Sequence, residues 1–254
     1  MAKRVFIFDL DDTLIDNVHD YAGPILDMAR LIICVLGPRA PHVSKIISLE
    51  EELDLRRRGE INPDTGKVFG YSMERFPGTL VETYRAICCR ANVDSVLDVE
   101  KQLYQIGAGA FNKDLYAKNI KPGAIDTINF IINEGDVCML LTKGDKRVQV
   151  NKIAALGQAS DLFWGGIKIV DEKTPEIFRR MVTKFSGCQW YSVGNDYDKD
   201  IAPAFEVKSF RGIWIPVETW ETIDKMGEIR NRVDGTRCLE LQSLTELKEK
   251  YGEL

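Results

Sequence analysis

The sequence predicts an α/β protein in which a doubly wound parallel sheet is interrupted by an inserted, mostly helical domain. Two observations support the sheet: short apolar runs recur along the chain, and helical patterns separate most of them. The runs are residues 5–8, 137–141, 164–170, 190–193, 213–215 and 238–241. A third observation supports the insertion, because residues 17–117 contain few such runs and show helical periodicity instead.

Helix starts in the sheet-forming part carry recognisable signals. Thr174, Pro175 and Glu176 offer an N-cap with proline at the first helical position, and apolar residues follow at helical spacing up to Phe185. A capping box at residues 243–246 predicts the start of a last helix. The predicted core domain therefore comprises residues 1–16 and 118–254.

The insertion, residues 17–117, has helical periodicity over residues 21–36 and 80–104. Residues 56–66 combine charge with turn formers, which predicts an exposed excursion whose three arginines form a solvated surface. Residues 107–110 contain two glycines but follow a helical pattern rather than a strand. We therefore interpret them as a loop and not as a dinucleotide-binding fingerprint.

Composition narrows the class of protein. The chain of 254 residues has 34 Lys and Arg against 39 Asp and Glu, which argues against nucleic acid as a partner. The longest apolar candidate, residues 31–36, is far shorter than a membrane span, and the N-terminus lacks signal-peptide features, so we expect a cytoplasmic protein that does not bind a membrane. Six cysteines without a C-x-x-C pair predict reduced, mostly buried thiols.

Polar and charged residues follow four of the predicted strands, and only two histidines exist, so we expect chemistry based on carboxylates, lysine and threonine. The carboxyl ends of parallel strands share one edge of the sheet, where ligands bind. A single acidic cluster would equally suit a turn or a helix N-cap. Four polar strand ends favour a functional crevice; they are residues 9–14, 142–145, 171–175 and 194–200.

These motifs resemble those of the haloacid dehalogenase superfamily, in the same order and over the whole chain. An Asp-x-Asp-x-Thr motif, a strand-ending threonine, a lysine and an acidic cluster match Asp9, Asp11 and Thr13, then Thr142, Lys173 and the segment from Gly194 to Asp200. The resemblance implies the Rossmann-like fold of that superfamily, with residues 17–117 in the place of its C1-type helical cap.

The resemblance and the residue types together imply a phosphate-transfer mechanism. Asp9 would be the nucleophile that forms an aspartyl-phosphate, and Asp11 would protonate the leaving group and then activate water. Mg²⁺ would be held by Asp9, the backbone carbonyl of Asp11 and the acidic cluster. The predicted phosphate-binding residues are Thr142, Lys143 and Lys173, and the predicted supporting residues are Thr13 and Asp200.

The fourth motif permits two registers. In the first, Asn195 holds the metal position, where the family pattern has an aspartate; in the second, Asp196 binds the ion. We expect Asn195 in the metal position, with Asp196 supplying the nearby negative charge. Asp200, farther along, is expected to orient Lys173 or the loop.

The predicted function is Mg²⁺-dependent hydrolysis of phosphate monoesters of small metabolites. Dehalogenases of this fold lack the second acid, because halide leaves without a proton, so Asp11 favours phosphoryl chemistry. A phosphomutase or other phosphoryl transferase remains an alternative, as does a weakly active member that acts mainly as a binding protein. The sequence leaves the oligomeric state open: Trp214 and Trp220 lie near a strand end, and Trp220 could cover the core as readily as meet a partner. Candidate substrate contacts in the insertion are Tyr71, Arg75, Tyr84, Arg85 and Arg90.

Overall fold

The computed structural model describes residues 3–185, 187–219 and 222–254, and it divides into two compact units. The sheet unit comprises the chain up to Asn17 and from Asp114 onward, and the helical unit comprises Val18–Lys113. The sequence-based limits of the insertion, 17 and 117, thus lie one and four residues from these borders. Trp220 lies outside the described residues.

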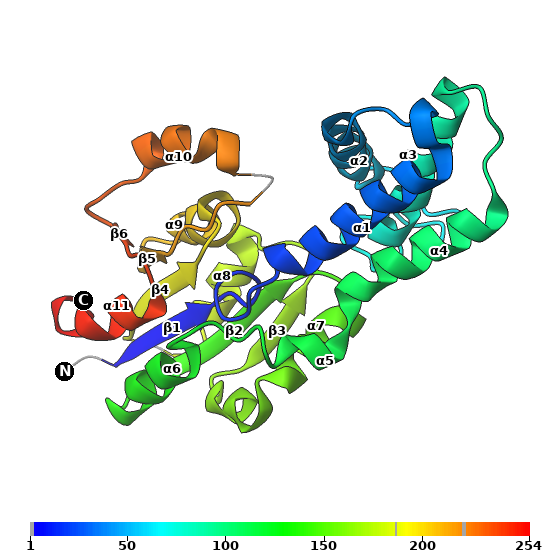
Figure 1. The fold of residues 1–254 in the computed structure, drawn as a ribbon. Coiled ribbons are helices and arrows are strands. Elements are labelled where there is room, and N and C mark those ends of the chain that lie inside the picture. The colour runs from blue at the N-terminus through cyan, green and yellow to red at the C-terminus, as the bar shows by residue number, and fades with distance from the viewer. Residues whose placement is uncertain (1–2, 186, 220–221) are drawn as a thin grey trace. The chain divides into compact units, whose positions relative to one another are not determined.

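The described residues of the sheet unit form one six-stranded, entirely parallel sheet (Figure 1). The strand order is β3-β2-β1-β4-β5-β6. The chain therefore winds outward from β1 to one edge and then returns to the other side of β1, which makes this a doubly wound sheet. The strands are β1 (Arg4–Phe8), β2 (Val137–Lys143), β3 (Ile167–Val170), β4 (Gln189–Gly194), β5 (Phe210–Trp214) and β6 (Cys238–Glu240).

Alternating side chains of the strands bury both faces of the sheet. In β1, Phe6 and Phe8 belong to one hydrophobic cluster, whereas Val5 and Ile7 belong to the cluster on the opposite face. The first cluster includes residues of α6 (Ala124–Asn133) and α11 (Leu244–Glu249), and the second includes residues of α8 (Pro175–Val182) and α9 (Ala202–Phe205). The remaining helices of this part are α5 (Lys113–Tyr116), α7 (Lys146–Ala155) and α10 (Met226–Arg232).

The helical unit has its own core, as expected of a separate folding domain. Its helices are α1 (Val18–Leu36), α2 (Val43–Arg57), α3 (Arg75–Arg90) and α4 (Leu97–Ala108). Met28, Ile46, Leu80 and Leu103, one from each helix, are fully buried in a single cluster.

Two sequence interpretations of the helical unit are wrong. Gly107 lies in helix α4 rather than in a loop; a Cβ there would stand 2.6 Å from Pro77 Cα, so glycine allows α3 and α4 to pack closely. Of the three arginines expected to form a solvated surface, only Arg56 is exposed. Arg57 pairs with Glu82 at 2.6 Å and has a side chain 15% exposed, and the side chain of Arg58 is 17% exposed.

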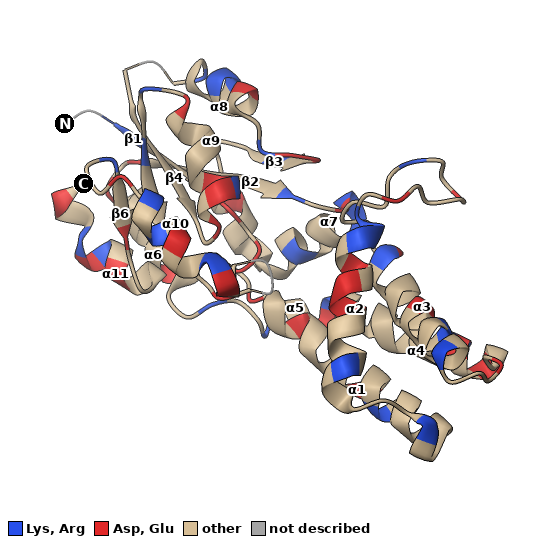
Figure 2. Cartoon of the chain, turned by 90° about the horizontal axis from the view of Figure 1, so that it is seen from above, with Lys and Arg blue, Asp and Glu red and all other residues tan. Residues whose placement is uncertain are grey.

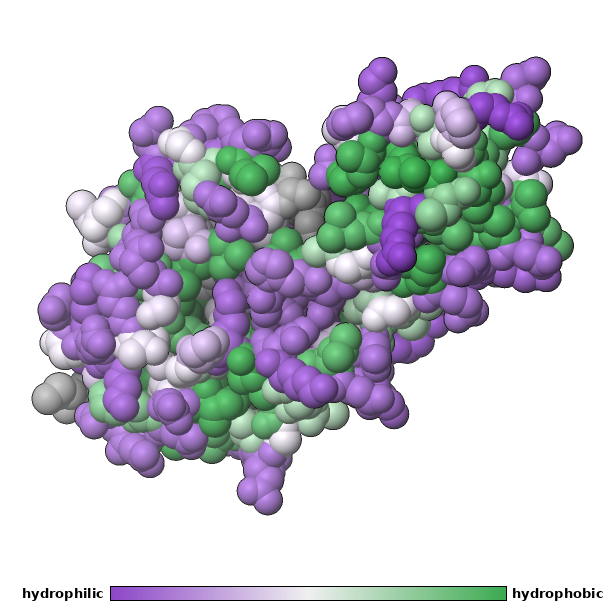
Figure 3. All heavy atoms as spheres, viewed as in Figure 1, coloured by the Kyte–Doolittle hydropathy of each residue, from purple (hydrophilic) through white to green (hydrophobic). Residues whose placement is uncertain are grey.

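Helix α1 is longer than the longest apolar candidate of the sequence analysis, residues 31–36. With the following turn it spans 22 residues, Val18–Arg39, long and apolar enough by length and composition alone to cross a membrane. Core helices and signal sequences satisfy the same criteria, so the finding is weak. Met28, Ala29 and Ile32 pack in the core of the helical unit, whereas Leu26, Ile33 and Val35 of α1 are exposed. Figure 3 shows hydrophobic surface on this unit.

Charged residues are mixed in both units, where Figure 2 shows basic and acidic positions interspersed. All six cysteines are free thiols, as predicted, although Cys34 and Cys89 are exposed.

A buried polar cluster between α2 and α3 makes a testable contribution to stability. Burial raises the pKa of Glu50 to about 8, Asp54 and Glu51 add to the effect, and Arg75 opposes it. Between the ordinary carboxyl pKa and about 8, the folded state therefore keeps a proton that the unfolded state has lost. The free energy of unfolding falls with rising pH across that window.

We expect Glu50→Gln to remove this loss and to stabilise the protein by on the order of a few kcal/mol at pH 9, with little effect at pH 4. Chemical denaturation from pH 4 to 9 measures it. Glu52→Gln, on the exposed side of the same helix, is the control. Parallel pH profiles for wild type and Glu50→Gln would show that Glu50 is ionised in the folded state.

Candidate active site

The candidate site lies at the carboxyl ends of the three central strands. Asp9 directly follows β1, Thr142 and Lys143 end β2, and Asn195 directly follows β4. Because β1 pairs with both β2 and β4, these residues come from adjacent strand ends. The amide of Asp9 donates to Val193 O at 2.9 Å, which continues the pairing of β1 with β4 up to the site. The site therefore lies at the point where the chain reverses its direction of winding.

A tight turn after β1 presents Asp11 and Thr13. The amides of Leu14 and Ile15 both donate to Leu10 O, at 2.9 and 3.0 Å, and close the turn. Asp12 has a φ of 58°, a left-handed conformation that aspartate tolerates better than most residues. Its side chain accepts the Asn17 amide at 2.9 Å, and its carbonyl accepts Lys121 Nζ at 2.6 Å. Asp12 and Lys121, which the sequence did not single out, thus fix the backbone between the two functional side chains.

Lys173 connects the two buried carboxylates of the site. Its Nζ donates to Asp9 Oδ1 and, at 2.7 Å, to Asp200 Oδ1. All three side chains are less than a tenth exposed. One ammonium thus faces two carboxyl groups inside the protein.

Burial dominates the protonation of this cluster. It raises the pKa of Asp9 to about 7; Lys173 opposes the rise, and Asp200 and Asp11 add to it. Burial also raises the pKa of Asp200 against the attraction of Lys173. For Lys173, burial alone lowers the pKa, but Asp200 and Asp9 together outweigh it and hold the pKa above its ordinary value. The lysine is therefore a permanent cation beside the proposed nucleophile.

The oxygens around Thr13 fit a hard cation. Thr13 Oγ1 lies 3.3 Å from both Asp9 Oδ2 and Asn195 Oδ1, so the Thr13 hydroxyl brings a carboxylate oxygen and an amide oxygen near each other. Magnesium commonly takes one or two protein oxygens and keeps several waters. Among the residues that the structure describes, no group of three His, Cys, Asp or Glu side chains forms a metal site. The oxygens of Asp9 and Asn195 suit such an ion, and the part of the Asp11 backbone carbonyl stays a prediction.

Asp196 and Asp200 take different positions after β4. The carboxylate of Asp196 accepts the Lys199 amide at 3.1 Å and pairs with Lys199 Nζ at 2.9 Å, which caps the π-helical turn Tyr197–Ile201. That turn directs Asp200 back under β4, where a Cβ on Gly194 would stand 2.3 Å from Asp200 Oδ2. Glycine is therefore needed at position 194 for Asp200 to reach Lys173.

Two residues of α7 contact Asp11. Gln149 Nε2 donates to Asp11 Oδ2 at 2.8 Å, and Lys152 Nζ donates to Asp11 Oδ1 at 2.6 Å. Thr142 Oγ1 in turn donates to Gln149 Oε1 at 3.0 Å. The sequence analysis missed Gln149 and Lys152. Their spacing of three residues, on one face of a helix that begins after Thr142, is the only signal the sequence offers.

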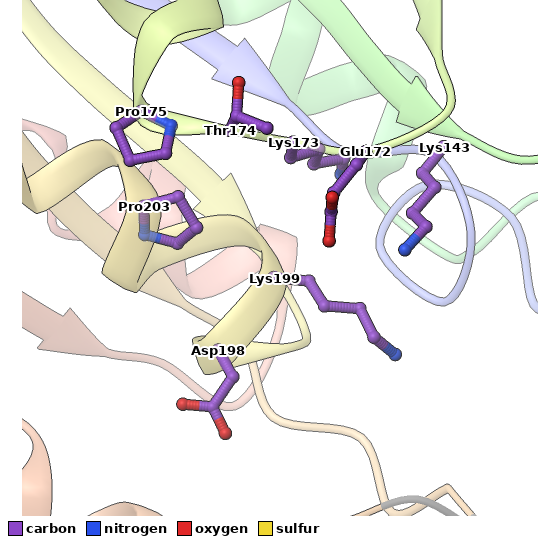
Figure 4. A pocket seen from close by; sticks show the side chains of 8 residues that line it. All are labelled: Lys143, Glu172, Lys173, Thr174, Pro175, Asp198, Lys199 and Pro203. Carbon is purple, nitrogen blue, oxygen red and sulfur yellow. The ribbon is translucent and has the colours of Figure 1, made fainter.

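A pocket of ≈ 330 Å³ lies beside Lys173 (Figure 4). In Figure 4 the side chains of Lys143, Lys199 and Glu172 extend toward the same open space, whereas Asp198 points away from them. Lys143 and Lys173, two of the predicted phosphate-binding residues, line this pocket. The other residues that line it are Glu172, Thr174, Pro175, Asp198, Lys199 and Pro203.

The structure brings Asp9, Thr13, Lys173, Asn195 and Asp200 into one network of contacts, and Thr142 reaches Asp11 through Gln149. Three of the candidate substrate contacts in the helical unit are buried or paired with a carboxylate. Arg75 is 4% exposed and paired with Asp54, Tyr84 is fully buried, and Arg85 pairs with Glu100 at 2.6 Å. Arg90 is exposed. Tyr71 lies against the guanidinium groups of Arg58 and Arg75.

Comparison with known proteins identifies the fold. No family model and no curated protein sequence matches the chain. Among solved structures, a haloacid dehalogenase-like family hydrolase from Xanthomonas campestris is 19% identical, with a TM-score of 0.68 over 99% of this chain and 96% of that one. The chain therefore has the haloacid dehalogenase-like fold, as predicted.

Two further structures show the range of proteins with this fold. A HAD phosphatase from Thermococcus onnurineus is 17% identical, with a TM-score of 0.55 over 98% of both chains. A HAD-hydrolase from Bacillus subtilis, solved bound to magnesium, is 14% identical, with a TM-score of 0.51 over 98% of both chains. L-2-haloacid dehalogenases share the fold as well. The fold alone therefore does not separate phosphatases from dehalogenases.

Proposed function

We propose that the protein is a Mg²⁺-dependent phosphatase that hydrolyses phosphate monoesters of small metabolites through an aspartyl-phosphate on Asp9. The observation that carries this proposal is that two carboxyl groups, two residues apart in the sequence, have different surroundings. Asp9 is buried against Lys173, whereas Asp11, two residues later, is a quarter exposed and held by separate donors. A nucleophile and a separate proton donor are the two groups that stepwise phosphate ester hydrolysis requires.

In the first step, a carboxylate oxygen of Asp9 attacks phosphorus while the bond from phosphorus to the ester oxygen breaks. Asp11 gives its proton to the departing alkoxide, which leaves as an alcohol. Lys173 stays protonated and offsets the charge that gathers on the phosphoryl oxygens and on Asp9. Asp9, Asn195 and the Asp11 carbonyl would hold Mg²⁺, which would supply further positive charge beside the phosphoryl group.

In the second step, Asp11, now a carboxylate, takes a proton from water as the water oxygen attacks phosphorus. The bond between phosphorus and Asp9 breaks, so Asp9 returns to a carboxylate and inorganic phosphate leaves. Asp11 ends protonated and ready for the next substrate. Thr142, Lys143 and Lys173 are the proposed phosphate-binding residues in both steps. The Thr142 hydroxyl, which donates to Gln149 in the structure, would have to turn that bond to a phosphoryl oxygen.

Asp11 also bears on the choice between phosphatase and dehalogenase. Loss of a halide needs no proton, so dehalogenation gives no chemical reason to keep a carboxyl group two residues after the nucleophile. Here two buried donors hold that carboxyl group in place. The proposal therefore places phosphate monoesters before haloacids as substrates.

We place the enzyme in the cytoplasm, with neither nucleic acid nor membrane as a partner.

Purified protein assayed against phosphorylated metabolites, an aryl phosphate and L-2-haloacids, each with Mg²⁺ and with EDTA, tests the proposal. We expect phosphate release from monoesters only with Mg²⁺ and no halide release. Halide release without phosphatase activity would replace the proposal with dehalogenation. Phosphatase activity that survives exhaustive chelation would remove the metal from it.

The metal position gives a separate prediction. Asn195→Asp replaces an amide oxygen by an anionic oxygen, which Mg²⁺ prefers, so we expect a lower half-saturating Mg²⁺ concentration. Because Lys199 engages the carboxylate of Asp196, we now expect Asp196→Ala to change that concentration less than twofold. Mg²⁺ titration of phosphatase activity measures both. A large loss of Mg²⁺ affinity in Asp196→Ala would restore Asp196 as a ligand.

A further inference from the structure

The contacts of Asp11 with helix α7 suggest a role for two residues outside the four motifs. Gln149 and Lys152 are 3% and 2% exposed, although both side chains are polar and Lys152 is charged. Burying such groups costs free energy unless their partners are well placed. Both residues direct their polar atoms to Asp11, one to each carboxylate oxygen.

Each of the two side chains is itself held in place. Lys152 Nζ also donates to Asn17 Oδ1 at 2.5 Å and lies 5.5 Å from the centre of the Tyr116 ring. Gln149 Oε1 accepts from Thr142 Oγ1, and Gln149 Nε2 also lies 3.3 Å from Lys143 O. The amide of Gln149 is thus fixed by the end of β2, and the ammonium of Lys152 by the segment that follows the turn after β1.

We propose that Gln149 and Lys152 are positioning residues that fix the carboxyl group of Asp11 for proton transfer to the leaving group. Each donor occupies one lone-pair site of a carboxyl oxygen, and the transferred proton is carried on a second lone-pair site of Asp11 that faces the substrate. The inference rests on the proposed phosphatase function and adds to it a link between α7 and the acid. A side chain with two freely rotating torsions spends little time in one proton-transfer geometry, whereas donors on both carboxylate oxygens select a single orientation. The side-chain amide of Gln149 bonds to both Thr142 and Asp11.

The dependence on the leaving group separates this role from a structural one. An alkyl phosphate needs its leaving oxygen protonated, whereas p-nitrophenolate departs without a proton. The ratio kcat/KM reports the steps up to loss of the leaving group, so it isolates the first proton transfer. We expect Gln149→Leu and Lys152→Met each to lower kcat/KM for an alkyl phosphate by roughly 10- to 100-fold, and by less than about threefold for p-nitrophenyl phosphate.

Lys146→Met and Asn151→Leu, on the exposed side of the same helix, are matched controls with no expected effect on either substrate. Equal losses for both substrates in folded Gln149→Leu and Lys152→Met protein would show a structural role only and overturn the proposal. Unchanged kcat/KM for both substrates would overturn it as well.

Crystal structures of the two variants provide a test that does not depend on activity. We expect the Asp11 carboxyl group to leave its observed position or to occupy several positions. An unmoved Asp11 in both variants would overturn the proposal even if the wild-type protein hydrolyses phosphate esters. A wild-type protein inactive on both esters would instead contradict the proposed function, and a displaced Asp11 in the variants would still show that α7 orients it.

Discussion

Asp9→Asn is expected to lower phosphate monoester hydrolysis by roughly 10⁴-fold or more, because the amide cannot replace the carboxylate that attacks phosphorus. The fold should survive the change. Burial raises the pKa of Asp9 to about 7, so the free energy of unfolding falls as the pH rises from the ordinary carboxyl pKa to about 7, and the whole cost is present at pH 8. The variant leaves Lys173 with one carboxylate partner, Asp200, and should be at least as stable as wild type at pH 8 in EDTA.

Steady-state hydrolysis, circular dichroism and thermal unfolding measure these effects. Asp126→Asn replaces an exposed aspartate of the sheet unit and serves as the control, with near wild-type activity. Turnover by folded Asp9→Asn protein at a rate near wild type would remove Asp9 from the role of nucleophile.

Lys173→Met is expected to lower kcat/KM by on the order of 10² to 10³, since it removes a preorganised charge at the phosphoryl group. It also leaves Asp9 and Asp200 buried without their shared cation, so a loss of stability of roughly 3 to 5 kcal/mol should accompany it. Activity is therefore compared at a temperature where the variant remains folded, beside the exposed Lys248→Met.

A double variant separates the two effects of Lys173. Asp200→Asn removes one of the stranded carboxylates, so Lys173→Met with Asp200→Asn should recover part of the lost stability but none of the lost activity. Recovery of activity together with stability would mean that Lys173 only maintains the fold. Equal, small effects of Lys173→Met and Lys248→Met would place Lys173 outside the mechanism.

The sheet and the strand-end residues were predictable because local pattern determines them. A buried parallel strand is a short apolar run, and its carboxyl end fixes the position of the next polar residue, as with Phe8 and Asp9 or Val193 and Asn195. The helical unit was harder to predict. The periodic stretch 80–104 is broken between α3 and α4, and α2 was missed because its inner side carries charged residues such as Glu50 and Asp54.

Spacing alone could not assign the fourth motif or find the residues around Asp11. The π-helical turn decides that Asp200 meets Lys173 and that Asp196 meets Lys199, and that turn is not encoded in a count of residues. Gln149 and Lys152 look like ordinary polar positions of a helix in the sequence. Their role becomes visible only when the turn after β1 and helix α7 come together in the fold.

The most direct test of the account is a single turnover in H₂¹⁸O, with protein in excess over substrate and with Mg²⁺ present. An aspartyl-phosphate is hydrolysed by water attack on phosphorus, so the label should appear in inorganic phosphate, while the peptide that contains Asp9 keeps its natural mass. Dehalogenation through an ester of Asp9 with water attack at the carboxyl carbon would instead place the label in Asp9. Labelled Asp9 with unlabelled phosphate would contradict the account.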